Sequence, residues 1–153
     1  MNIPFYIAEH VLQVSKGDNW TEVNLHDTLK DVNYKDAGTQ TQISVNTIAS
    51  LVHHLAYWNR IMVQRIAGIK IEIPVVNGFD VPVLAGDHEW QALLNDYQSS
   101  AQELALAIKG IDMKRLEQPI LPGYSSVYKN IQGAVEHIHY HLGQIVMLKK
   151  AIK

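Results

Sequence analysis

Residues 127–150 read VYKNIQGAVEHIHYHLGQIVMLKK, and this stretch decides the fold. Apolar residues and one histidine recur in it at alternating steps of four and three, the spacing that keeps one face of an α-helix turned toward a core. We call this row of residues the seam. The seam consists of Val127, Ile131, Ala134, Ile138, His141, Ile145 and Leu148. Ser125 or Ser126 is suited to cap this helix, which is predicted to run almost to the end of the chain.

Three earlier segments show the same periodicity, over about residues 4–15, 44–68 and 87–109. The first has Phe5, Ala8, Val11 and Leu12 on one side, and Asp87 is predicted to cap the third. The core-facing residues of the second are Ile48, Leu51, Leu55, Trp58, Met62, Ile66 and Ile69. Glycines 17, 68 and 110 mark the predicted ends of the three helices.

The connections are of two kinds. Asn24 is suited to cap a short helix through Leu25 and Leu29, with Trp20 packed beneath it, and residues 34–42 read as loop. Prolines and a glycine interrupt residues 70–86, which therefore predict an irregular crossover. The sequence thus predicts an all-α fold: a four-helix bundle with a long crossover between helices 2 and 3, which need not be antiparallel neighbours. Residues 1–153 are predicted to form a single domain.

Composition excludes several classes of function. The chain contains no cysteine, so it has no disulfide, no thiolate ligand and no cysteine nucleophile. Its formal charge is -2, and its lysines and arginines are dispersed, which argues against nucleic acid as a partner. We see neither a signal peptide nor an apolar run of about 18 residues, and therefore expect a cytoplasmic protein without membrane contact.

The histidines divide by the helix face they occupy. At about 100° per residue, His137 and His141 flank or enter the core face of their helix, whereas His139 lies opposite. In the second helix His54 borders the apolar seam and His53 faces away. Histidines four residues apart are close enough for their imidazoles to share one ion.

Three inward imidazoles need partners, because each buried ring without one costs roughly 1 to 3 kcal/mol. A shared divalent cation satisfies all three and leaves an open coordination position, as in catalytic sites. The sequence therefore predicts a metal site made by His54, His137 and His141. The alternative for each ring is an ordinary core histidine bonded to a carbonyl or tyrosine. The remaining histidines are predicted to be exposed or capping: His10, His26, His53, His88 and His139.

The segments HHLAYW (53–58) and HIHYHLGQI (137–145) resemble the two signatures of the DinB-like superfamily, also called DinB/YfiT-like metalloenzymes. Residues 19–32 and 44–60 are also similar to the amino-terminal half of that family. The resemblance implies a four-helix bundle, a homodimer and a three-histidine metal site whose ligands map to His54, His137 and His141. Gln144 is a candidate partner of a ligand or substrate, and Trp58 is a candidate wall of the pocket. The alternative for Trp58 is ordinary core packing, and the alternative for Gln144 is a position facing solvent or a neighbouring helix.

From these residues we expect a divalent-metal-dependent enzyme acting on a small molecule, with zinc or nickel favoured over iron, cobalt or manganese. The family resemblance points to a thiol-dependent S-transferase or a hydrolase, in which the ion activates a low-molecular-weight thiol or water. The alternative function is a non-catalytic dimeric module that binds metal or another ligand.

Overall fold

The computed structural model describes residues 1–152, and within them the chain is helical, without a β-strand. The long helices are α1 (Ile3–Lys16), α4 (Ile48–Ile66), α5 (Asp87–Lys109) and α6 (Val127–Ile152). The short ones are α2 (Leu25–Leu29), α3 (Tyr34–Gly38) and the 3-10 turn η1 (Met113–Arg115). The prediction of an all-α fold is confirmed.

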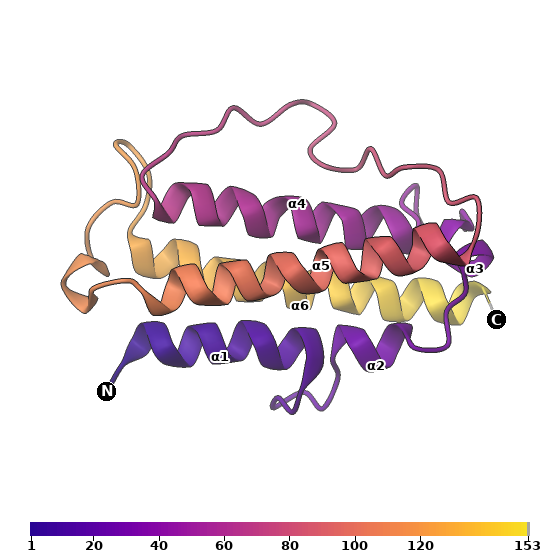
Figure 1. Ribbon diagram of the computed structural model, residues 1–153, viewed down its shortest axis with the longest axis horizontal. Coiled ribbons are helices and arrows are strands. Elements are labelled where there is room, and N and C mark those ends of the chain that lie inside the picture. The colour runs from indigo at the N-terminus through magenta and orange to yellow at the C-terminus, as the bar shows by residue number, and fades with distance from the viewer. Residues whose placement is uncertain (153) are drawn as a thin grey trace.

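The long helices pack side by side as a bundle (Figure 1). Both α1 and α4 contact α5 and α6. Helices α4 and α5 begin at the same end of the bundle and run parallel, while α1 and α6 run in the opposite direction (Figure 1). The chain between α4 and α5 must therefore return along the whole bundle, and it does so as an irregular crossover over residues 67–86, as predicted. The second and third long helices are neighbours, but they are not antiparallel.

The helix starts follow from local capping chemistry. Thr47 and Ser50 form a capping box at the start of α4, in which each side chain accepts a bond from the other residue's backbone N–H. This box places the start at Ile48, four residues after the predicted Ser44. At α6, the Ser126 hydroxyl accepts from the Lys129 backbone N–H at 3.2 Å, as predicted for a cap. Asp87 is the first residue of α5 and not its cap, which is Gly86.

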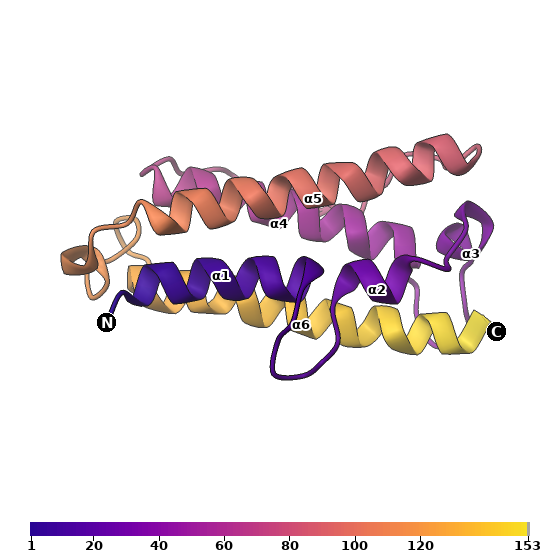
Figure 2. The same cartoon turned by 60° about the horizontal axis from the view of Figure 1, so that its bottom comes forward.

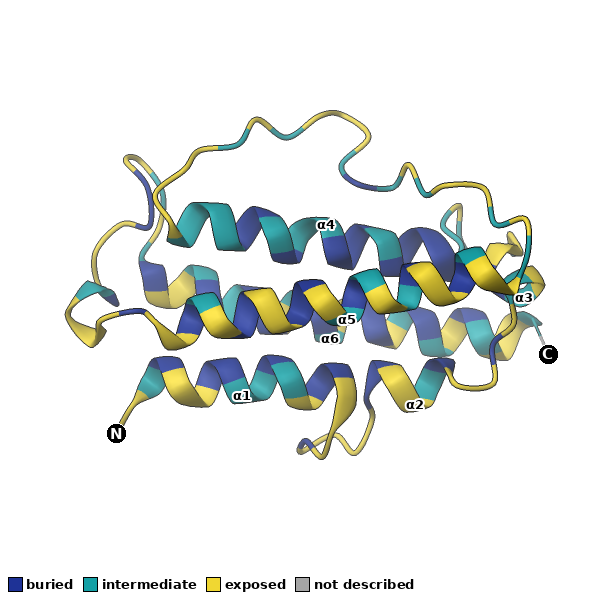
Figure 3. Ribbon diagram, viewed as in Figure 1, coloured by how far each residue is buried: buried dark blue, intermediate teal, exposed yellow. Residues whose placement is uncertain are grey.

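The core lies between the long helices, where their buried faces meet (Figure 3). All seven members of the α6 seam are buried, including His141. Trp90 of α5 is also buried and donates its indole N–H to the Val32 carbonyl at 2.8 Å, which fixes α5 to the segment after α2. The period of the α6 seam therefore matches the packing of that helix.

Helix α2 continues the line of α1 along α6 (Figure 2). Leu25 and Leu29 are buried there, and Lys149 of α6 donates to the Thr28 carbonyl at 2.7 Å. Lys149 also pairs with Asp31. No helix in residues 1–152 is both long and apolar enough to cross a membrane.

Several predictions about the first 42 residues are wrong. Trp20 is 96% exposed and does not pack beneath α2, because the loop that carries it turns outward. Phe5 is also exposed, so the buried face of α1 is centred on Ile7, Ala8 and Val11. Residues 34–38, predicted as loop, form α3, which Asn33 caps through bonds to the backbone N–H groups of the first turn.

Candidate metal centre

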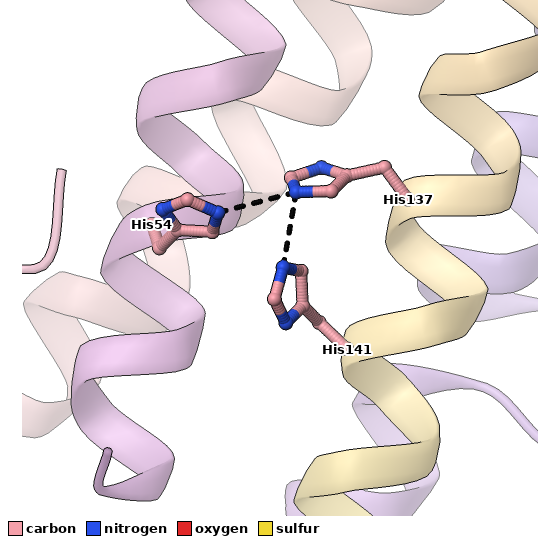
Figure 4. A group of neighbouring side chains, drawn as sticks. All are labelled: His54, His137 and His141. Carbon is pink, nitrogen blue, oxygen red and sulfur yellow. Dashed lines mark hydrogen bonds between the residues drawn. The ribbon is translucent and has the colours of Figure 1, made fainter. Parts of the chain in front are cut away.

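Three histidines from two helices meet inside the bundle (Figure 4). His54 comes from α4, and His137 and His141 come from adjacent turns of α6. The Nε2 atom of His137 lies 3.1 Å from Nε2 of His54 and 3.0 Å from Nε2 of His141. Each residue offers one potential ligand atom, and these atoms all lie within 4.8 Å of one another. The structure thus brings together the three residues that the sequence selected.

The backbone of α4 and α6 explains this convergence. His54 is only 3% exposed and lies on the stripe of α4 that also carries Leu51 and Leu55. His141 is 6% exposed within the α6 seam, and His137 is half-buried one turn before it. Because α4 packs directly against α6, rings on these two faces point at one another.

The crossover orients the first of these rings. The Nδ1–H of His54 donates to the backbone carbonyl of Asn77, 2.6 Å away. A carbonyl oxygen only accepts, so this bond keeps the ring proton on Nδ1 and leaves Nε2 with a lone pair. Phe79 of the same segment stacks on the His54 ring, and Trp58 donates its indole N–H to the Asn77 side-chain oxygen at 3.0 Å.

A second bond orients His141. Its Nδ1–H donates to the side-chain oxygen of Gln144 at 2.6 Å, one turn further along α6. The proton of His141 is therefore also on Nδ1, and its Nε2 presents a lone pair to the centre of the cluster. Of the roles left open for Gln144, the structure shows a hydrogen bond to one of the three histidines.

These two bonds make the cluster fit a cation. The Nε2 lone pairs of His54 and His141 both face Nε2 of His137, which carries at most one proton and so satisfies at most one of them. One positive ion between the rings satisfies all three nitrogen atoms. The two Nε2 separations from His137, 3.1 and 3.0 Å, are close to the roughly 3.3 Å expected for two nitrogens each about 2.0–2.1 Å from one tetrahedral ion, and the ligand atoms of His54 and His141 lie within 4.8 Å of each other. The arrangement is therefore compatible with a divalent metal that accepts neutral imidazole.

The surroundings keep these rings neutral. Burial lowers the pKa of His54 to about 4, and the hydrogen bond to Asn77 only partly opposes that shift. Burial, followed by the charges of His141 and His54, lowers the pKa of His137 to about 3. Burial also lowers the pKa of His141, against the opposing bond to Gln144. Neutral imidazole is the form that binds metal, so the site needs no deprotonation step near pH 7.

A cavity of about 340 Å³ opens beside the histidine cluster. His137 lines it together with Trp58 and Met62 of α4, while Gly133 and Lys129 of α6 form the other side. Trp58 is therefore a wall of this cavity, which is the role that the sequence suggested. A small molecule in the cavity lies directly against the ring of His137.

The other histidines do not join the cluster. His53 faces away from the core, as predicted, but it is half-buried beneath the crossover and bonds the Gly78 carbonyl through Nδ1 at 2.9 Å. The prediction that His10 and His139 are exposed or capping is wrong. Both are half-buried, and their Nε2 atoms lie 3.0 Å apart between α1 and α6. His26 and His88 are exposed, as predicted.

Sequence reasoning missed Asn77 and Phe79, which hold and cover His54. Both lie in the irregular crossover, where no periodicity shows which side chains face inward. One local signal was present: Asn77-Gly78 is a dipeptide typical of tight turns. Both residues have positive φ, 54° and 75°, and this turn aims the Asn77 carbonyl at the helix below.

Comparison with known proteins gives a match at the level of the family. The family model described as "DinB superfamily" matches residues 19–145, more than four-fifths of the chain. The matched range includes all three histidines of the cluster. No curated protein and no solved structure matches the chain significantly.

Proposed function

The chain belongs to the DinB superfamily, and from that premise we propose that it is a divalent-metal-dependent enzyme whose ion is held by His54, His137 and His141. One observation carries the proposal: two ring nitrogens with lone pairs face a third that can satisfy only one of them. Zinc or nickel suits this all-nitrogen set best, and iron, cobalt and manganese are the alternatives.

The reaction we propose is transfer of a small thiol to an electrophile, or hydrolysis. A divalent ion held at such a site would lower the pKa of a bound water to about 7, and it would favour the thiolate form of a bound thiol. The chain has no cysteine, so any reacting thiol comes from a second substrate.

Residues around the histidine cluster orient the candidate ligands and line the cavity for a substrate. Asn77 and Gln144 fix the tautomers of His54 and His141, so that the Nε2 atoms stay available. Trp58 and Met62 give the adjoining cavity an apolar wall, against which the apolar part of a substrate would pack beside His137. The cavity is large enough for a small organic substrate, in keeping with the range of roughly 300 to 1,000 Å³ typical of such sites.

Metal analysis tests the site. The protein is purified without a polyhistidine tag and its metal content is measured by mass spectrometry. We expect close to one ion per chain in the wild type, and loss of the ion in His54→Ala and His141→Ala. His139→Ala is the matched control, because this half-buried histidine of α6 lies outside the cluster. Equal loss of metal in all three variants contradicts the site.

Turnover tests the chemistry separately. The metal-loaded protein is incubated with small thiols and an electrophile such as a chlorinated aromatic or an epoxide, and product is followed by chromatography. We expect a rate that disappears with chelator and in His141→Ala. If the protein binds one metal ion per chain but shows no metal-dependent rate of thiol transfer or of ester and amide hydrolysis, the non-catalytic binding module is favoured.

A further inference from the structure

Arg65 lies at the cavity beside the histidine cluster in an unusual setting. Its guanidinium carbon is 5.2 Å from the ring centroid of Trp58 and 5.2 Å from that of Tyr124. The two rings come from different segments, α4 and the loop before α6. Such stacking uses the faces of the guanidinium and leaves the N–H groups at its edge available for hydrogen bonds.

Neither Arg65 nor the nearby Lys129 has an acidic partner in residues 1–152. The ion pairs in that part of the chain involve other lysines and arginines, such as Arg60 with Asp96. The residues that line the cavity include these two cations and no aspartate or glutamate. The chain as a whole has a net charge of -2, so this positive lining is a local feature.

The cations and the histidine cluster belong to one cavity. The Trp58 ring is 6.0 Å from the His137 ring, and Arg65 stacks against the same indole. One aromatic ring therefore separates the guanidinium from a residue of the candidate metal centre. A small molecule that reaches both must carry a metal-binding group at one end and an anionic group a few bonds away.

We propose that Arg65 and Lys129 form an anion-binding subsite, which selects a small thiol or substrate that bears a carboxylate. This inference rests on the proposed function, since the other end of that molecule is assigned to the metal centre. The planar edge of Arg65 receives the carboxylate, and Lys129 at the exposed rim adds a second positive charge.

Binding of two matched thiols tests this subsite without turnover. The protein is loaded with cobalt(II) and titrated with 3-mercaptopropionate or with 3-mercapto-1-propanol, which replaces the carboxylate by a neutral hydroxyl. The sulfur-to-cobalt absorption band reports binding. We expect the wild type to prefer the carboxylate by roughly tenfold, which is about what one charge-assisted hydrogen bond supplies. The preference should shrink as salt is added.

Variants identify the residues responsible. In Lys129→Gln and Arg65→Gln the preference should fall several-fold, and in Lys129→Glu it should disappear. Lys150→Gln is the matched control, an exposed lysine of the same helix outside the cavity, and should behave as the wild type. Lys129 is also exposed, so its variants are expected to fold even if Arg65→Gln does not.

The outcomes separate the two proposals. Equal affinity for both thiols in the wild type, or a preference that survives in both Lys129→Gln and a folded Arg65→Gln, overturns the subsite and leaves the metal enzyme intact. Absence of a cobalt spectrum overturns the proposed function and this inference with it. If cobalt binds but neither thiol changes its spectrum, then the metal does not bind thiols. That result overturns both the proposed thiol transfer and the proposal that the subsite selects a thiol with a carboxylate.

Discussion

The ring of Phe79 lies flat against the imidazole of His54, with the centroids 3.9 Å apart and the planes inclined by 10°. Two residues earlier, the Asn77 carbonyl receives the Nδ1–H of the same imidazole. The crossover therefore both orients and covers His54, a residue that belongs to α4. Substitutions at Phe79 and Asn77 should therefore change the candidate metal centre.

Phe79→Ala should weaken metal binding. The substitution removes the stacked ring and exposes His54 to water, and an aromatic contact of this kind is worth roughly 0.5–1.5 kcal/mol, or about two- to tenfold in affinity. Affinity is measured by competition with a chromophoric chelator. Val83→Ala, at an exposed position of the same crossover, is the control and should leave the affinity unchanged. An unaltered affinity in Phe79→Ala would show that the stacking is incidental.

Gln144→Ala should weaken metal binding by roughly 10- to 100-fold, the usual effect of removing the hydrogen-bond partner of a ligating histidine. Without this acceptor the His141 ring loses the bond that fixes its proton on Nδ1. Gln144→Glu keeps an oxygen in the same place and should retain most of the affinity. If Gln144→Ala and Gln144→Glu bind metal equally well, the bond to His141 does not prepare the site.

Gly78→Ala should destabilise the protein more than Gly68→Ala. Both glycines have positive φ, 75° and 84°, so an alanine at either position carries the left-handed backbone cost of roughly 1–2 kcal/mol. At Gly78 a new Cβ would also lie 2.6 Å from the Tyr57 ring, whereas at Gly68 nothing lies within 4 Å. Overpacking of that kind adds roughly 1–3 kcal/mol. Urea unfolding of the two variants measures the difference, and equal destabilisation would show that the crossover yields freely.

The metal-free protein should lose stability as the pH falls below about 6.5. Burial lowers the pKa of His54 to about 4 and of His137 to about 3, so the folded state binds fewer protons than the unfolded state between those values and the ordinary histidine pKa. The contribution of these residues to stability is complete above about pH 6.5 and declines toward pH 3 to 4.

Urea midpoints at about pH 7.5 and 5, measured with chelator present, test this dependence. The drop should be smaller in His137→Ala, which lacks one of the two groups. A drop of the same size in that variant would assign the effect to other residues.

Periodicity predicted the parts of the fold that repeat. The α6 seam is buried along its whole length because each of its members follows the helical repeat, and the same repeat separates His54 from His53. The contact of Gln144 with His141 also follows from spacing within one helix. These are properties of a single helix and can be computed from residue numbers.

What periodicity could not predict depends on contacts between segments. Trp20 is an apolar residue next to a short helix, yet the loop that carries it turns away from the core. The pairing of His10 with His139 requires knowing that α1 lies beside α6. The positions of Asn77 and Phe79 can be predicted only when the path of the crossover is known. The parallel arrangement of α4 and α5 requires a long crossover but does not determine its path.

The parallel arrangement of α4 and α5 places the candidate metal ligands and the residues that orient them in different kinds of structure. The three histidines lie on α4 and α6, whose packing forms part of the core, whereas Asn77 and Phe79, which orient and cover His54, lie in irregular chain without a helical repeat. Substitutions in the crossover can therefore alter the surroundings of the His54 ring while the three imidazoles keep their places on the two helices.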